Sequence, residues 1–182
     1  MLKRMIERQL NAFEKEWNYS LDYAREILDL GVMVLKRFQD AQAIGSYRAG
    51  ISEHAHMGVK LLGVMAGDCG PCVQLMVDMG ERAGVPQEAL AAIVRGELEA
   101  LSEDMRLPAE FTRSLLARDA QLPELRERMR ERYGPEGLVT VAYAVINASM
   151  YPTLKYALGH GHACAKIELG DRRLIPVDPL AA

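Results

Sequence analysis

The chain has 182 residues, of which 49% are hydrophobic and 26% charged, a composition that predicts one soluble globular domain and excludes a disordered chain. Its net charge is -3, with acidic and basic residues interleaved. A broad nucleic-acid-binding surface needs a basic excess, so we expect no nucleic-acid partner.

The N-terminal segment MLKRMIERQLNAFEKEW carries charges throughout and lacks the apolar stretch of a signal peptide. The longest nearly apolar run, residues 138–150, is too short to span a bilayer. We therefore predict a cytoplasmic protein with no membrane partner. In a reducing cytosol permanent disulfides are rare, so a close pair of cysteines is more often catalytic, redox-sensing or metal-binding.

The first half of the chain shows helical patterns with clear breaks between them. Apolar residues recur every three or four positions after Ser20, a residue suited to capping the start of a helix. Gly67 and Asp68 interrupt a later pattern, and Gly84 is typical of a helix C-terminus. Helices are predicted over residues 20–39, 52–66, 69–83 and 86–96, with a loop at 41–50.

The second half predicts three further helices and a short β-element. Residues 107–120 and 122–134 each begin with a Leu-Pro pair, which we take as a helix start, and Pro135 suits the first turn of the last long helix. Residues 138–151 are apolar on all sides and are predicted to form the central buried element, in which Asn147 must find a hydrogen-bond partner. Alternation in the segment AKIELGDRRLIPV predicts a small hairpin or an extended arm.

These patterns predict an all-α fold with at least about 60% helix, against a usual share of about one third. Residues 1–50 are expected to form an N-terminal helical arm. Residues 51–182 are expected to form the helical core with an extended C-terminal tail, and the two parts together one structural domain.

The sequence Cys69-Gly70-Pro71-Cys72 opens the third predicted helix. Free backbone N–H groups and the helix dipole stabilise a thiolate there, and Pro71 lacks an N–H that the first turn could not use. Both sulfurs are close enough to form a disulfide. Thioredoxins use the same CGPC motif, but after a β-strand, whereas the preceding residues here predict a helix. Asp68 opposes a very low thiol pKa, since a nearby anion disfavours the thiolate.

Two other interpretations of the cysteines remain open. They could be small buried hydrophobic residues, as free cysteines often are. They could also form a zinc site with His160, His162 and Cys164, although this spacing is not a usual zinc pattern. Because glycines flank both histidines, we expect His160 and His162 at a solvated helix end, and we predict no metal and no cofactor.

The segment MAGDCGPCVQLMVDMGERAGVPQEALAAIVRG, residues 65–96, resembles the alkylhydroperoxidase D / carboxymuconolactone decarboxylase-like family, and residues 142–159 resemble its second core helix. The resemblance covers about residues 50–160. It implies an all-helical homo-oligomer in which Cys72 attacks a hydroperoxide and Cys69 is its partner, with a dithiol protein or a lipoyl group as reductant. Other members of the family decarboxylate a lactone without these cysteines.

The chain departs from the peroxidase subgroup at two positions of its proton relay. That subgroup has a His four residues after the second Cys and a Glu twelve residues before the first, where this chain has Met76 and Met57. Glu53 and His56 lie close upstream and are our candidates to replace them. Because a thioether cannot transfer protons, we expect a slow peroxidase unless one of them does so.

The sequence thus predicts a thiol peroxidase that reduces hydroperoxides, with Cys69 and Cys72 as the redox pair and His56 and Glu53 as candidate relay residues. The first Cys of a helix-initial pair is usually the more exposed, so we expect Cys69 to exchange with the reductant. The alternatives are a non-catalytic or redox-sensing helical oligomer, and a decarboxylase-like enzyme that does not use the cysteines.

Overall fold

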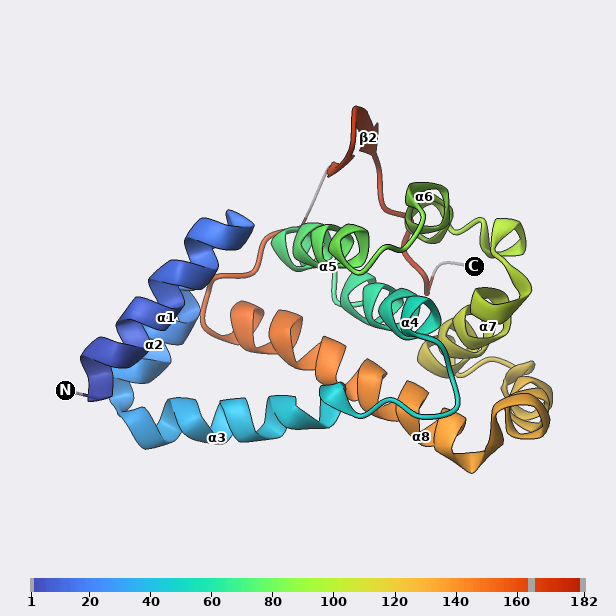
Figure 1. The fold of residues 1–182 in the computed structure, drawn as a ribbon, viewed down its shortest axis with the longest axis horizontal. Helices are drawn as coiled ribbons and strands as arrows, with labels where there is room; N and C mark the ends of the chain where they lie inside the picture. The colour runs from blue at the N-terminus through green and yellow to red at the C-terminus, as the bar shows by residue number, and fades with distance from the viewer. Residues whose placement is uncertain (1, 164–165, 181–182) are drawn as a thin grey trace.

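The computed structural model describes residues 2–163 and 166–180 and is 73% helical, which confirms the all-α prediction (Figure 1). In chain order the elements are α1 (Leu2–Trp17), α2 (Asp22–Leu30), α3 (Val32–Gln42), the 3-10 turn η1 (Ala43–Ser46), α4 (Glu53–Met65), α5 (Gly70–Arg82), α6 (Gln87–Arg95), the 3-10 turn η2 (Leu98–Ala100), α7 (Glu103–Ala117), α8 (Leu122–Ala157), β1 (Ile167–Leu169) and β2 (Arg172–Leu174).

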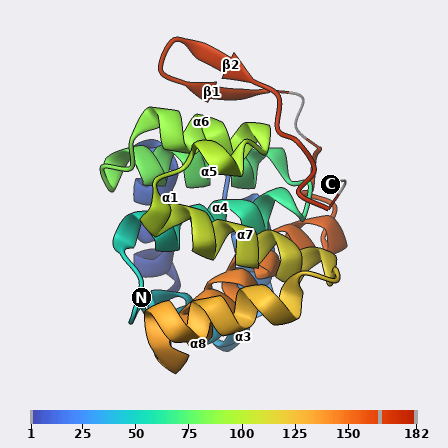
Figure 2. The same cartoon turned by 90° about the vertical axis from the view of Figure 1, so that its right-hand side faces the viewer.

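The centre of the fold is α4, which packs against α5, α6, α7 and α8 (Figure 2). Nine of its thirteen residues are buried. The prediction that residues 138–151 form the central element is therefore wrong. These residues of α8 cover one side of α4 and leave Val139, Tyr143 and Ile146 between 38% and 52% exposed. An all-apolar helix segment need not be covered on every side by its own chain.

The contact between α4 and α8 depends on a small residue. A Cβ atom added at Gly63 would lie 2.6 Å from the Cβ of Ala148, so only glycine allows this approach of the two helices. Close by, the Asn147 side chain donates a hydrogen bond to the backbone oxygen of Gln42 at 3.1 Å. The expected partner of this buried amide is therefore found at the end of α3.

The single helix predicted over residues 20–39 is divided in two. Gly31 has φ 141° and ψ 146°, a conformation open to glycine, and it separates α2 from α3. The N-cap position itself is held by Leu21, one residue after the predicted Ser20, and Leu21 makes no side-chain cap. The Ser20 hydroxyl instead accepts a bond from the N–H of Asp22 at 3.2 Å.

The helix predicted to begin at residue 107 begins earlier, at Glu103, and carries Pro108 in its interior. Proline has no N–H to donate to the backbone oxygen of Asp104, four residues before it. The hydroxyl of Tyr133 donates to that oxygen instead, at 3.1 Å. A long-range hydrogen bond thus compensates for the missing bond, which a local Leu-Pro signal could not reveal.

The last two predicted helices meet at a sharp kink. Gly134 has φ 69° and ψ 178°, so α8 is two helices joined at the residue before Pro135, and Pro152 does not end it. Among the described residues, one element, α8, is long and apolar enough to cross a membrane by length and hydropathy alone. However, 44% of its most apolar 18-residue window is buried inside the fold. The core helix of a globular protein has the same properties.

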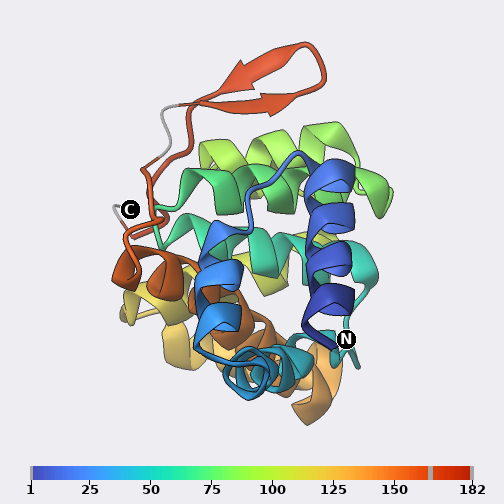
Figure 3. The same ribbon diagram turned by 90° about the vertical axis from the view of Figure 1, so that its left-hand side faces the viewer.

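The N-terminal helices form a layer on one side of the core (Figure 3). Their buried side chains form a second apolar cluster, which also contacts Leu75 of α5, Leu154 of α8 and Leu158 directly after α8. On another side lies the predicted hairpin, in which antiparallel β1 and β2 pair Ile167 with Leu174. The cysteine motif lies between these two peripheral parts, at the start of α5.

Candidate active site

The cysteine pair lies where the chain turns from α4 into α5. Asp68 has a positive φ of 45°, which reverses the chain after α4. Cys69 is the residue before the first turn of α5, and Pro71 lies within that turn. Cys69 and Cys72 form a disulfide with their Cα atoms 5.3 Å apart. The predicted closeness of the two sulfurs at a helix start is confirmed.

Both cysteines are buried in this oxidised form. Cys69 is 0% exposed and Cys72 3% exposed, so the first cysteine is not the more accessible of the two. The N–H of Gly70 donates to the backbone oxygen of His162 at 2.9 Å, which holds the segment after α8 against the motif. Small molecules must therefore reach the sulfurs through cavities.

Cys72 lines an apolar cavity of about 390 Å³ between the N-terminal layer and the core. We call it the apolar cavity. On α5 its wall is a single helix face, with residues spaced by three and four positions. Its lining residues are Ile6, Gln9, Leu10, Phe13, Tyr19, Leu21, Tyr23, Ala24, Leu35, Phe38, Gln39, Gln42, Met57, Lys60, Val64, Cys72, Leu75, Met76, Met79, Asn147 and Tyr151.

The two positions where the peroxidase subgroup carries its relay both face this cavity. Met57 lines it from α4 and Met76 from α5, beside Cys72. Both positions therefore share the cavity that Cys72 lines, but both side chains are thioethers and cannot carry a proton. With Met79 they form the adaptable apolar packing expected of methionines near the pair.

The structure does not bring Glu53 or His56 to the disulfide. Both belong to the first turn of α4, whereas the cysteine motif follows its last turn, about 13 to 18 Å further along the axis. Glu53 is exposed and lies 3.9 Å from Arg48 in an ion pair. His56 is 5% exposed and its Nε2 atom has no hydrogen-bond partner in the described part of the chain. Neither residue lines the apolar cavity.

The buried ring of His56 makes the free energy of unfolding depend on pH. Burial, followed by the nearby charges of Lys60 and Arg48, lowers the pKa of His56 to about 4. The native ring stays neutral while the unfolded chain takes up a proton below about pH 6.5, so stability falls as pH drops from about 6.5 to about 4. We expect His56→Leu to remove roughly 3 kcal/mol of that fall.

Urea denaturation at half-unit steps of pH measures this effect. His54→Leu is the matched control, since it removes an imidazole two positions away that is only partly buried, and its unfolding free energy should keep the wild-type dependence on pH. If the free energy of unfolding changed with pH equally in wild type and His56→Leu, the lowered pKa of His56 would not be the cause of the pH dependence.

A polar array that the sequence did not reveal contacts Cys72. The Tyr19 hydroxyl lies 3.8 Å from the Cys72 Sγ atom. The Lys155 ammonium donates to the same hydroxyl at 3.2 Å. It also lies 4.5 Å from the centroid of the Tyr19 ring and 5.6 Å from that of Tyr23, both favourable cation–π distances. Tyr19 and Lys155 are buried, at 7% and 4% exposure.

The charges in this array fix the direction of its hydrogen bonds. An ammonium can only donate, so the Tyr19 oxygen accepts from Lys155, and its own O–H is free to donate to sulfur. Burial raises the pKa of Tyr19 to about 12, so the phenol keeps its proton at neutral pH. Burial lowers the pKa of Lys155, and the negative charge of Asp22 opposes that shift.

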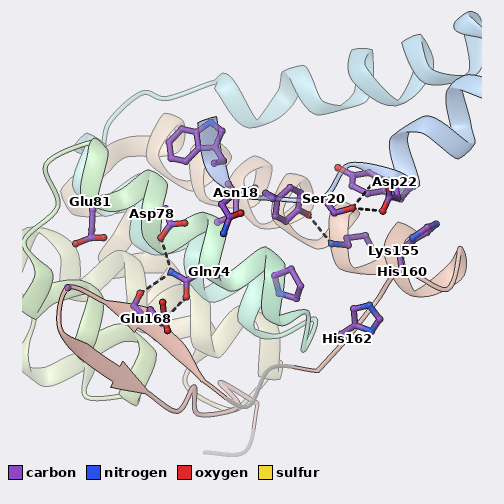
Figure 4. A pocket seen from close by; sticks show the side chains of 16 residues that line it. Asn18, Ser20, Asp22, Gln74, Asp78, Glu81, Lys155, His160, His162 and Glu168 are labelled. Atoms are coloured by element: carbon purple, nitrogen blue, oxygen red, sulfur yellow. Dashed lines mark hydrogen bonds between the residues drawn. The ribbon is translucent and has the colours of Figure 1, made fainter. Parts of the chain in front are cut away.

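Tyr19 also lines a second, larger space of about 660 Å³, which we call the polar cleft (Figure 4). Its walls are the loop after α1, one side of α5, the end of α8 and the hairpin. Gln74 attaches the hairpin to α5 by donating to the backbone oxygen of Glu168 at 2.9 Å and accepting from its N–H at 2.8 Å. Tyr19 thus stands between the apolar cavity and the polar cleft. The cleft is lined by Trp17, Asn18, Tyr19, Ser20, Asp22, Tyr23, Pro71, Gln74, Leu75, Asp78, Glu81, Lys155, His160, His162, Glu168 and Gly170.

The histidines after α8 do not assemble a metal site with the pair. His160 Nε2 lies 2.9 Å from a carboxylate oxygen of Glu26, and His162 is exposed. Cys164 lies outside the described residues. Among residues 2–163 and 166–180, no three His, Cys, Asp or Glu side chains are placed to hold a metal ion.

Sequence reasoning missed Tyr19 and Lys155 because 136 positions separate them. A signal was present, since Lys155 is a charged residue in the apolar second half of α8, but nothing local identifies its partner. Comparisons of the chain with protein-family models, curated proteins and solved structures gave no match.

Proposed function

We propose that this protein is a CxxC-dependent thiol peroxidase of the alkylhydroperoxidase class, in which Cys72 attacks a hydroperoxide and Cys69 resolves the product. One observation carries the proposal. Cys72 lines an apolar cavity and lies against a phenol that a buried ammonium supports. A reactive thiol needs its thiolate stabilised, and a hydroperoxide needs a proton for its leaving oxygen.

The Tyr19 and Lys155 pair serves both needs in the reduced protein. The Cys72 thiolate attacks the outer peroxide oxygen, the O–O bond breaks, and an alcohol leaves with a proton donated by the Tyr19 hydroxyl. Lys155, which donates to that hydroxyl, supplies the replacement proton. The Cys69 thiol then attacks the sulfenic acid on Cys72, forming the disulfide and releasing water.

A dithiol must return two electrons to the disulfide before the next cycle. A thiolate of the reductant attacks one sulfur, and its second thiol displaces the other cysteine through a mixed disulfide. The polar cleft offers the route, because Pro71 and Gln74 on its wall lie beside the pair. A lipoyl group or a dithiol protein is the proposed reductant, as the family resemblance implies.

We also propose that the protein is a homo-oligomer with the alkylhydroperoxidase D-like helical architecture. The support is the apolar face of α8, where Val139, Tyr143 and Ile146 are exposed. The Tyr143 ring stacks edge-on against the ring of Tyr47, also exposed, with centroids 5.8 Å apart. A second copy could cover this face.

Thiol titration tests the proposed function directly. We expect the fully reduced protein to lose two thiols per chain on addition of one equivalent of cumene hydroperoxide, and a dithiol such as dihydrolipoamide to restore both. Cys164→Ser, with the third cysteine removed, is the matched control and should behave identically. An unchanged thiol count would favour the non-catalytic oligomer.

A further inference from the structure

Lys60 is the charged residue of the apolar cavity. It lies on α4 three positions after Met57, so both side chains share the helix face that lines the cavity. Every other side chain in the lining is apolar or neutral at pH 7. Within residues 2–163 and 166–180, the Lys60 ammonium has no hydrogen bond or ion pair.

This arrangement favours an anionic ligand. An ammonium in apolar surroundings is poorly solvated, and burial lowers the pKa of Lys60 as a consequence. The neighbouring His56 is neutral at pH 7, so it supplies no opposite charge to the ammonium. A carboxylate beside Lys60 would supply the missing opposite charge.

The lining of the apolar cavity also restricts the charge, polarity and size of a ligand. One ammonium compensates one negative charge, so a dianion such as a phosphate monoester would leave a net charge buried. Gln39, Gln42 and Asn147 add neutral amide groups, while the remaining wall is mostly aliphatic, aromatic and thioether. A volume of about 390 Å³ lies in the usual range for small-molecule sites.

We propose that the apolar cavity binds a monocarboxylic acid with an apolar body, its carboxylate paired with Lys60. The hydroperoxides that the protein reduces would then be those of apolar organic acids. This identification of the substrate rests on the proposed function. Lys60 projects from α4 and Cys72 from α5, so a ligand anchored by its acid group extends its apolar body along the wall that carries the sulfur.

Isothermal titration calorimetry of the oxidised protein with decanoate tests binding without any peroxide chemistry. We expect decanoate to bind at least ten-fold more tightly than decan-1-ol, which has the same chain length and no charge. Lys60→Met should lose at least ten-fold in decanoate affinity and keep its weak affinity for decan-1-ol. Lys60→Arg, which keeps the charge, should retain most of the decanoate affinity.

Lys15→Met is the matched control, because it removes an exposed lysine from α1, which also borders the cavity, and should change nothing. Equal binding of decanoate and decan-1-ol, or an unchanged affinity in Lys60→Met, overturns the proposal. Decanoate should also inhibit cumene hydroperoxide reduction competitively. If calorimetry succeeds and no peroxidase activity exists, the binding site stands while the proposed function fails.

Discussion

We expect Cys72→Ser to abolish the proposed hydroperoxide reduction, with a fall of at least about 10³-fold in kcat/KM, because a serine hydroxyl is not ionised at neutral pH and cannot replace the attacking thiolate. Cys69→Ser should instead complete a single turnover and stop at a sulfenic acid on Cys72. The two variants therefore differ in what accumulates. Stopped-flow reaction with cumene hydroperoxide, followed by dimedone trapping and mass spectrometry, measures both outcomes.

The structure gives the reason for this asymmetry between the two cysteines. Cys72 lines the apolar cavity and contacts the Tyr19 hydroxyl, whereas Cys69 is fully buried and lines neither the cavity nor the polar cleft. Cys164→Ser should turn over normally. A dimedone adduct on Cys69 in the Cys72→Ser protein, with none on Cys72 in the converse variant, would reverse the assignment.

The parts of the fold that were predictable from sequence depend on neighbours in the chain. The break after α4, the start of α5 at the cysteine pair and its end before Gly84 follow from local glycines, prolines and apolar spacing. The disulfide itself is a contact over three positions. Each of these features is decided within one or two helical turns, where residue type and spacing contain the necessary information.

The features that were not predictable depend on distant partners. Pro108 stays inside α7 because Tyr133 compensates for its missing N–H from another helix. The apolar segment of α8 is only partly buried because the other helices cover one side of it. Tyr19 reaches Cys72 because the N-terminal layer folds back onto α5. The local helical patterns of residues 1–50 predict an N-terminal arm but contain no information on the contact of Tyr19 with Cys72.

The candidate relay residues illustrate how strongly a helix constrains position. His56 is only one residue away from the position of Met57, but one residue turns the side chain by about 100° around the axis. Met57, Lys60 and Val64 share the face that lines the cavity, and His56 points to a different side. Glu53 does lie one turn before Met57, but its side chain is exposed to solvent and pairs with Arg48 outside the cavity.

Tyr19→Phe should lower kcat/KM for cumene hydroperoxide by about 10²-fold, the lower end of the usual contribution of a positioned acid–base group. Removing the hydroxyl takes away the only hydrogen-bond donor that contacts the Cys72 sulfur within the described residues, at 3.8 Å, and breaks the hydrogen bond to Lys155. The thiolate loses a hydrogen bond, so the pKa of the Cys72 thiol should rise. Absorbance of the thiolate near 240 nm as a function of pH measures that shift separately from the rate.

Tyr151→Phe is the matched control for this experiment, because it removes another phenol hydroxyl from the same cavity that makes no hydrogen bond to Cys72 or Lys155 in the described residues, and its rate should stay within about threefold of wild type. Lys155→Met leaves Tyr19 in place but removes its proton supply, so we expect a similar loss of rate.

Met76→His in the Tyr19→Phe background offers a second test, since position 76 faces the cavity and an imidazole there can accept and return a proton. Partial recovery would show that Tyr19 does the work of the absent histidine. A Tyr19→Phe protein with wild-type rate and thiol pKa would show that proton transfer at Cys72 depends on solvent alone.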